Sequence, residues 1–326
     1  MKNARKLLSL MLAPTLIVSM LAGCSSSTAA TTAATTTAGT TAAATTAATT
    51  EAATTAVETT AAAGTTTADS SQTTAAASAN QDYDGTVYKI ACDAAYAPFS
   101  IQLETGKTAP GTVVTTANNM GDYYGIDVEL LDAIAKYEGF TYELTPMDFS
   151  AIIPALLSGT IDGSIAGMNI TDERKEKVDF SDGYYASGSA LVVNKDNTDI
   201  TSFEDLDGKV AACKEGTTGM TWSQDNADTY GFTVTVYPDS ASMMLAVANG
   251  QADFLIEDYP VISYQITIGE QADLKVAIDA IGEVPQNGFA VAKGKNATLL
   301  AMFNEGLAAI RANGTYDQII AEYISD

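Results

Sequence analysis

The sequence has no histidine among its 326 residues. Histidine is the commonest general base and a common metal ligand, so its absence excludes a His-dependent catalytic triad and a zinc site built on imidazole. Positive charge is scarce too: 16 Lys and Arg residues face 40 Asp and Glu residues, and the formal net charge is −24. A chain this acidic repels nucleic acid and anionic lipid. We expect no nucleic-acid partner, and no residue pattern predicts a metal or a cofactor.

Cysteine is nearly absent, with 3 residues in the whole chain. Cys92 and Cys213 fall in two separate expected strands. Two thiols in an exported domain can form a disulfide, but residues in separate strands are better interpreted as buried, unpaired thiols. We expect the unpaired state.

Residues 1–24 carry the pattern of an export signal. Lys2, Arg5 and Lys6 precede the apolar run "LLSLMLAPTLIVSM", and the small-residue ending "LAGC" follows. This order indicates a secretory signal rather than a membrane span. The ending resembles a bacterial lipobox, which implies that Cys24 is lipidated and becomes the first mature residue. The alternative is an ordinary signal peptide with a chance cysteine. With lipidation, the protein would be tethered to the outer face of the cell membrane.

Residues 25–84 consist mostly of Thr, Ala and Ser and contain almost no large apolar side chain. Such a tract cannot bury enough apolar surface to offset its chain entropy. We expect a flexible stalk with an r.m.s. reach on the order of 40 Å, and its Thr and Ser residues leave O-glycosylation open.

From residue 85 onward, strand and helix patterns alternate. Residues 126–138 have apolar side chains at helical spacing, and Gly139 closes the pattern. Such alternation predicts parallel, doubly wound α/β sheets, and the length suits two lobes. A long loop or hairpin is expected between Asp93 and Tyr124. Strands are expected at 87–92, 140–144, 161–167, 189–194, 209–213, 232–237, 253–257 and 288–293, and helices at 150–159, 218–231, 240–250, 258–269, 296–314 and 315–325.

A further helix is expected to begin after Thr171, an N-cap residue followed by Asp172 and Glu173. Arg174 comes next, in the first turn, where the helix dipole disfavours a cation. This placement suggests that Arg174 has a role other than helix stability.

Ligands of open α/β sheets bind at the carboxyl ends of the strands. The residues that follow the expected strands mix both charges with aromatic rings, which suits a small zwitterion better than a phosphate. The alternatives are ordinary ones: capping or loop acids, core aromatics, a solvated lysine and a surface ion pair of Arg174. With Arg174, the candidate residues are Asp93, Tyr96, Phe149, Gly167, Asn169, Lys214, Thr217, Thr218, Glu257 and Asp258.

Residues 146–188 resemble the core block of bacterial extracellular solute-binding proteins of the family 3 type, the polar amino acid receptors of ABC importers. The similarity is greatest to glutamine-binding proteins. Three further blocks resemble the family in the right order: "DAAYAPFS", "DLDGKVAACKEGTTG" and "LAAIRANGTYDQII". The resemblance spans about residues 87–320.

This resemblance implies the two-lobed periplasmic-binding-protein fold of type II, in which each lobe is a doubly wound sheet. Two hinge strands would join the lobes, with the ligand closed between them. The implied segments are 85–184 plus 288–326 for lobe 1, 190–281 for lobe 2, and about 185–189 and 282–287 for the hinges.

The resemblance also implies ligand contacts by position. Arg174 matches the arginine that clamps the α-carboxylate of the ligand, with help from the amides near Thr217 and Thr218. Asp258 matches the acid that receives the α-ammonium, with help from the Gly167 carbonyl. A planar guanidinium can grip a carboxylate through two parallel hydrogen bonds, which a lysine cannot reproduce.

The side chain of the ligand would lie between Tyr96 and Phe149, with Asp93 and Lys214 near its far end. The chain departs from the family pattern at three positions. Asn169 replaces a hydroxyl residue, although it can still donate to a carboxylate, Thr218 replaces a glycine, and Glu257 replaces the histidine of the glutamine-binding relatives.

The charges of the candidate residues do not decide which amino acid binds. Arg174 and Lys214 face Asp93, Glu257 and Asp258, one negative charge in excess. A cationic side chain (arginine, lysine or histidine) would neutralise the site if all five face the cleft. If Lys214 instead neutralises Glu257, a neutral amide such as glutamine fits.

We therefore expect an extracytoplasmic, lipid-anchored, monomeric protein that binds a polar amino acid and delivers it to the permease subunits of an ABC importer. We expect no enzymatic activity. The alternatives are an exported cyclohexadienyl dehydratase, which would act on prephenate or arogenate with the same fold, and a ligand-sensing receptor domain.

Overall fold

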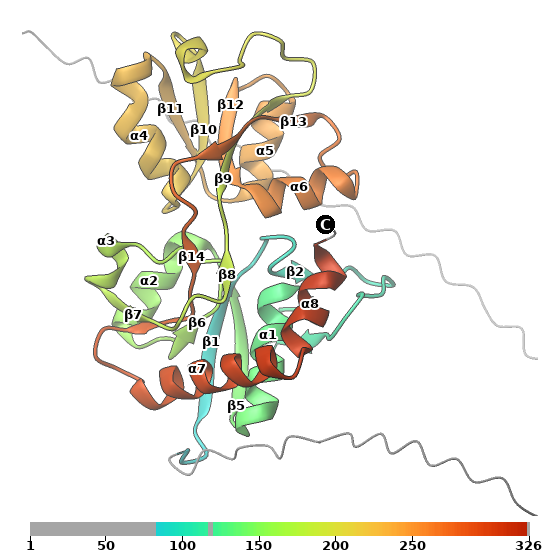
Figure 1. Cartoon of the computed structure of the whole chain (residues 1–326), viewed down its shortest axis with the longest axis vertical. Helices are drawn as coiled ribbons and strands as arrows, with labels where there is room; N and C mark the ends of the chain where they lie inside the picture. The colour runs from blue at the N-terminus through green and yellow to red at the C-terminus, as the bar shows by residue number, and fades with distance from the viewer. Residues whose placement is uncertain (1–82, 117–119, 325–326) are drawn as a thin grey trace, which may run out of the picture. The chain divides into compact units, whose positions relative to one another are not determined.

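The computed structural model describes residues 83–116 and 120–324, all of which fall in one compact unit (Figure 1). The expected signal segment, Cys24 and residues 25–82 of the expected stalk lie outside the described residues. Within the described ranges, none of the helices has the length and apolarity needed to cross a membrane.

The first sheet has five strands in the order β5-β1-β6-β15-β7. Strand β1 runs parallel to β5 and β6, whereas β15 runs antiparallel to β6 and β7. Helices α1, α7 and α8 pack on one another, and α2 packs on the strands (Figure 1). The bounds are β1 Val87–Asp93, β5 Thr141–Met147, β6 Gly163–Ser164, β7 Val178–Phe180, β15 Ala290–Ala292, α1 Ile126–Glu138, α2 Phe149–Ser158, α7 Ala297–Ala312 and α8 Thr315–Tyr323.

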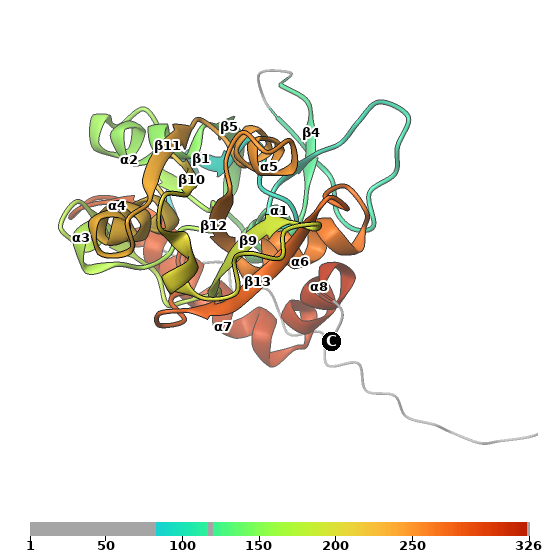
Figure 2. The ribbon, with the colours of Figure 1, turned by 90° about the horizontal axis from the view of Figure 1, so that it is seen from above.

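The second sheet has five strands in the order β11-β10-β12-β9-β13. Strand β10 runs parallel to β11 and β12, and β9 runs antiparallel to β12 and β13. Figure 2 shows β12, β9 and β13 side by side. The bounds are β9 Ser189–Asn194, β10 Val210–Lys214, β11 Thr233–Tyr237, β12 Phe254–Asp258, β13 Leu274–Ile281, α4 Thr218–Tyr230, α5 Ser240–Ala248 and α6 Tyr259–Thr267, with a 3-10 turn η1 at Phe203–Leu206.

The chain crosses between the two sheets twice. It passes from β7 to β9 through β8 (Tyr185–Ala186) and returns from β13 to β15 through β14 (Gln286–Asn287). Strands β8 and β14 pair antiparallel, and both lie between the two sheets (Figure 1). Below, lobe 1 is the body built on the first sheet and lobe 2 is the body built on the second.

The α/β architecture is confirmed, but the expectation of purely parallel sheets is wrong. Strand β9 in the second sheet and strand β15 in the first, each next to a crossing, run opposite to the other strands of their sheets, whereas β13 runs in the same direction as β12 because both are antiparallel to β9. Hydrophobic pattern identifies a strand without giving its direction, so this reversal could not be read from composition. Strand β13 itself was not expected at all.

Several boundaries also differ. Helix α2 begins at Phe149 after the N-cap residue Asp148, not at Ser150. The expected strand at 161–167 pairs only at Gly163–Ser164. The stretch between β1 and α1 forms a small sheet in the order β2-β4-β3, with bounds Ile101–Gln102, Asp122–Tyr124 and Val114–Thr115.

The two thiols are unpaired, as expected. Cys92 lies in the core of lobe 1 and Cys213 in the core of lobe 2, and both are buried and free. Burial raises the pKa of Cys92 to about 12, so its thiol keeps its proton.

Gly125 sets the entry into α1, the helix whose first turn supports the site described below. Its φ is +122°, and a Cβ atom there would lie 2.6 Å from the carbonyl oxygen of Phe99 and 2.7 Å from that of Pro98. These two carbonyls accept the N–H groups of Ile126 and Asp127 at 2.9 Å each.

We therefore expect Gly125→Ala to lower the free energy of unfolding by about 2–4 kcal/mol, since backbone strain and a backbone clash add. Gly139→Ala is the matched control, because its φ is +79° but nothing lies within 4 Å of the added Cβ; it should cost about 1 kcal/mol. Urea unfolding followed by circular dichroism measures both, and equal losses would contradict the account.

Candidate ligand-binding site

A small closed cavity lies where lobe 1 meets lobe 2. Its volume is about 20 Å³, roughly the room of one water molecule. All eleven residues that the sequence singles out line it. The lining also includes three residues that the sequence analysis does not assign to the site: Ser189, Gly219 and Ile256.

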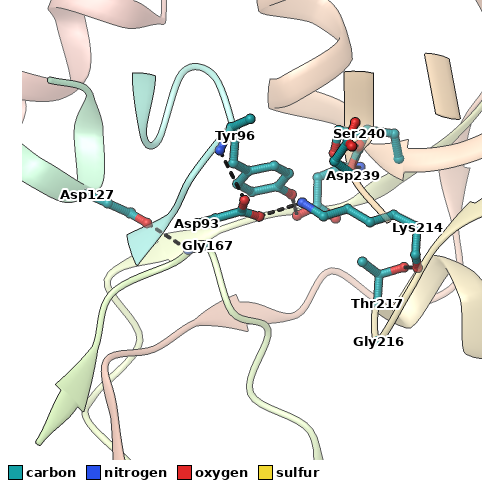
Figure 3. A network of polar contacts seen from close by, with 12 residues as sticks. Asp93, Tyr96, Asp127, Gly167, Lys214, Gly216, Thr217, Asp239 and Ser240 are labelled. Carbon is teal, nitrogen blue, oxygen red and sulfur yellow. Dashed lines mark hydrogen bonds and ion pairs between the residues drawn. The ribbon is translucent and has the colours of Figure 1, made fainter. Parts of the chain in front are cut away.

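An ion pair between the lobes forms one wall of the cavity. The Lys214 ammonium lies 2.5 Å from a carboxylate oxygen of Asp93, and the two side chains are only 2% and 4% exposed. Asp93 ends β1 in lobe 1, and Lys214 ends β10 in lobe 2. Figure 3 shows the Lys214 side chain extended toward Asp93. Removing two charges from water is costly, so each needs a close partner.

Two aromatic rings of lobe 1 lie beside the Lys214 ammonium. The nitrogen is 4.7 Å from the ring centroid of Tyr96 and 5.5 Å from that of Phe149. Ring faces attract cations, and more strongly when water is excluded. The Tyr96 hydroxyl also donates a hydrogen bond of 2.7 Å to Asp258, a second contact between the lobes. Burial raises the pKa of Tyr96 well above its ordinary value, so the hydroxyl remains a donor.

Arg174 lies on a helix of a single turn. Helix α3 spans Asp172–Lys175, and the Thr171 hydroxyl caps it as expected by accepting the Arg174 N–H at 3.2 Å. Because α3 has only four residues, Arg174 belongs to its last turn as much as to its first. The expected conflict between Arg174 and the helix dipole is therefore wrong.

The Arg174 guanidinium reaches from lobe 1 to lobe 2. One terminal nitrogen donates to the Asn169 carbonyl at 2.7 Å, and the other donates to the Gly216 carbonyl at 3.0 Å. The guanidinium also lies 5.3 Å from the ring centroid of Phe149. Burial lowers the pKa of Arg174, although a guanidinium stays protonated in proteins. Arg174 thus places a buried cation at the end of the cavity.

The departures at Asn169 and Thr218 form a contact between the lobes. The Thr218 hydroxyl donates to the side-chain oxygen of Asn169 at 2.8 Å. The side-chain nitrogen of Asn169 donates to Asn287 at 2.7 Å. In this arrangement Asn287, a residue that the sequence analysis missed, takes one of the two N–H groups of the amide that was expected to face a carboxylate.

Thr217 is the N-cap of α4, and its hydroxyl accepts the Met220 N–H at 3.1 Å. The same hydroxyl donates to the Lys214 carbonyl at 2.8 Å, which fixes the turn after β10. The first amides of a helix have no acceptor within it. The start of α4 therefore gives the cavity backbone N–H donors near Thr218.

Two consecutive carboxyl groups at the end of β12 share the cavity. Glu257 accepts hydrogen bonds from the Ser240 hydroxyl at 3.0 Å and from the Asp258 N–H at 2.9 Å. Burial, together with the charge of the neighbouring Asp258, raises the pKa of Glu257 to about 7. Burial also raises the pKa of Asp258 to about 6, against the lowering effect of Tyr96 and Arg174. Ser240, the first residue of α5, was not expected near the site.

Gly167 is held in place from behind the cavity. Its N–H donates to the Asp127 carboxylate at 2.7 Å (Figure 3), and the Tyr184 hydroxyl donates to the same carboxylate at 2.8 Å. Gly167 has a φ of +58°, and a Cβ atom there would lie 2.5 Å from the Tyr96 ring. Asp127 was missed by the sequence analysis, although an acid on the apolar stripe of α1 is a signal that could have revealed it.

The site thus joins five buried charged groups and two aromatic rings. Each described contact across the cavity links a strand end or helix start of one lobe to the other lobe. Such a site suits a molecule that carries both charges at one end, and it does not suit a polyanion.

Three carboxyl groups with raised pKa values make stability depend on pH. Burial raises the pKa of Asp127 to about 7, and Glu257 and Asp258 reach about 7 and 6. The folded protein therefore binds more protons than the unfolded chain between about pH 4 and pH 7. The stabilisation from these groups is full below about pH 4 and is lost as the pH rises through 6–7.

We expect the ligand-free protein to melt at a higher temperature at pH 5 than at pH 8, by about 2–4 °C for each kcal/mol involved. Asp127→Asn, which stays neutral, should reduce this difference. Thermal unfolding by circular dichroism at pH 5, 6, 7 and 8 measures it. A melting temperature that rises with pH, or an unchanged difference in Asp127→Asn, would show that these groups do not titrate as described.

The chain matches a known protein family in sequence. The model of the bacterial extracellular solute-binding proteins, family 3, matches residues 88–326. The arginine-binding extracellular protein ArtP of Bacillus subtilis (strain 168) is 31% identical over 196 residues, which cover 60% of this chain and 75% of the relative.

Solved structures match the fold. An ancestral arginine-binding protein bound to arginine is 35% identical with a TM-score of 0.64, and the match covers 73% of this chain and 98% of that one. The ancestral amino acid-binding protein AncCDT-1, described as a precursor of cyclohexadienyl dehydratase, is 32% identical with a TM-score of 0.62 over 74% of this chain and 96% of that one.

Proposed function

The chain belongs to the bacterial extracellular solute-binding proteins of family 3, and we propose that it captures a polar L-amino acid between its lobes and delivers it to an ABC importer. It is a binding protein and not an enzyme. The expected type II periplasmic-binding-protein fold is confirmed by the structural neighbours.

The observation that carries the proposal is the placement of Arg174 and Asp258 in one buried cavity. Arg174 raises the stability of the charged form of Asp258, so the two groups lie within electrostatic reach of each other. A guanidinium and a carboxylate that line the same cavity complement the α-carboxylate and α-ammonium of a zwitterion. The N–H donors at the start of α4 would assist the carboxylate, and the Gly167 carbonyl would assist the ammonium.

Binding would replace contacts that the protein makes with itself. Arg174 donates to two backbone carbonyls, and Asp258 accepts from Tyr96. The cavity of about 20 Å³ is too small for an amino acid, so the lobes must separate to admit one. We propose β8 and β14 as the hinges, because both chain crossings between the sheets pass through them.

We propose a ligand with a cationic side chain. The cavity carries Arg174 and Lys214 against Asp93, Glu257 and Asp258, so a ligand cation would balance the excess negative charge when all three acids are ionised. The relative ArtP and the ancestral structure are both named for arginine. Glutamine is the second candidate, because Lys214 already neutralises Asp93 at 2.5 Å and a neutral amide can bridge such a pair.

The setting of the protein follows from its amino-terminal sequence. We propose that Cys24 carries a lipid anchor at the outer face of the cell membrane and that residues 25–84 form a stalk for a monomeric binding domain. The permease of the importer would receive the amino acid from this domain.

We expect Arg174→Lys and Asp258→Asn each to weaken amino acid binding at least tenfold, because each removes one charge-assisted contact of about 1.4 kcal/mol or more. Lys175→Gln is the matched control, since Lys175 lies on the same helix but pairs with the exposed Asp172.

Titration calorimetry of residues 83–326 against the twenty amino acids measures this effect. The chain also has a single tryptophan, Trp222, which lines a second cavity of about 740 Å³ between α2 and α4. Its fluorescence should change as the lobes move. Near-wild-type affinity in both variants, with the control also unchanged, would contradict the assigned contacts.

A further inference from the structure

Lobe 1 presents a cation site, and a lysine from lobe 2 fills it. The Lys214 ammonium sits on the Asp93 carboxylate at 2.5 Å, with the rings of Tyr96 and Phe149 at 4.7 and 5.5 Å. Aromatic faces beside a carboxylate bind an ammonium or a guanidinium alike. Under the proposed function, the side chain of the ligand enters this same place.

A cationic ligand side chain must therefore compete with Lys214. Two cations beside the single carboxylate of Asp93 would leave one of them buried and unpaired, which is strongly unfavourable. A neutral amide meets no such conflict, because it can donate to Asp93 and accept from Lys214. Lys214 needs a second partner if the site is to accept a cation.

Glu257 is positioned to be that partner. Strands β10 and β12 run parallel, and their last registered pair is Ala212 with Leu255. Lys214 and Glu257 each lie two residues further along, so they occupy matching positions on the same face of neighbouring strands. Lys214 also lowers the pKa of Glu257, which shows that the charges are within reach of each other.

We propose that Lys214 is a movable counter-cation that stays on Asp93 when the ligand side chain is neutral and turns to Glu257 when it is cationic. The inference rests on the proposed function. It assigns Glu257 a role in ligand selection, and it makes the flexible four-carbon stem of Lys214 the moving part.

Charge balance separates the two arrangements. With a cationic ligand, the ligand pairs with Asp93 and Lys214 pairs with an ionised Glu257. With a neutral ligand, Lys214 remains on Asp93 and Glu257 is best protonated, held by Ser240.

The groups that face Glu257 are consistent with a carboxyl that can take either form. Asp258 disfavours its charge and Lys214 favours it, while the Asp258 N–H and the Ser240 hydroxyl donate to it. Tyr96, from lobe 1, lies close enough for Glu257 to raise its pKa. Acidification should therefore weaken binding of a cationic ligand relative to a neutral one.

A double-mutant cycle tests the proposal, with L-arginine and L-glutamine as probes and calorimetry at pH 8, where Glu257 is ionised. Glu257→Gln should weaken arginine binding at least tenfold and leave glutamine binding equal or tighter, because glutamine then no longer requires a proton on the side chain at this position. Lys214→Met should weaken glutamine binding at least tenfold and arginine binding by a smaller factor, because the change frees Asp93 for the ligand but leaves the ionised Glu257 without its partner. The double variant should recover arginine affinity to within threefold of wild type, because no displaced lysine then needs a partner.

The recovery distinguishes a partner for Lys214 from a residue that only supports the fold, and melting temperatures verify that each variant is folded. Equal losses for both ligands in Glu257→Gln, or no recovery of arginine binding in the double variant, would overturn the proposal. A wild-type protein that binds glutamine but not arginine would overturn it as well. Absence of binding to any amino acid would instead overturn the proposed function on which it rests.

Discussion

The contact between Asp93 and Lys214 imposes the constraint on which the rest of the site depends. Two charges from different lobes are held away from water, and neither can remain buried without a partner. The same requirement applies to Arg174, which uses backbone carbonyls of both lobes, and to Asp258, which uses the Tyr96 hydroxyl. Closure of the lobes is therefore coupled to the pairing of charge, and a ligand that offers better partners can take over that pairing.

The fold delivers these groups through the ends of its strands. Asp93, Lys214 and Asp258 are the last residues of β1, β10 and β12, so two separate sheets point their carboxyl ends at one place. Parallel pairing of neighbouring strands is what brings such ends together. The reversed strand β9 and its partner β13 form the other half of the second sheet, and β8 and β14, which precede β9 and follow β13 in the chain, carry the chain between the lobes. Support for the cavity and connection of the lobes thus come from different strands.

Much of the site could be predicted from the sequence, because strand ends and helix stripes are local features. The rule that ligands bind where strands end selects Asp93, Lys214 and Asp258 without any knowledge of their contacts. The direction of β9 and the existence of β13 could not be predicted in this way, since both depend on where the chain crosses between the lobes. The hydrogen bond between Asn169 and Thr218 could not be predicted either, because it joins residues of different lobes and a local sequence pattern does not say which residues meet across the cavity. Asp127 could have been identified from the sequence, because it is an acid among the apolar positions of α1. It is buried, and its carboxylate accepts the N–H of Gly167.

The central claim is that Arg174 recognises the carboxylate of an amino acid within a closed, charge-paired cavity. Titration calorimetry with L-arginine and with agmatine, which is arginine without its carboxylate, tests this most directly. Agmatine has no carboxylate to pair with the buried guanidinium of Arg174. It should therefore bind at least about a hundredfold more weakly than arginine. Agmatine binding within threefold of arginine would contradict the account.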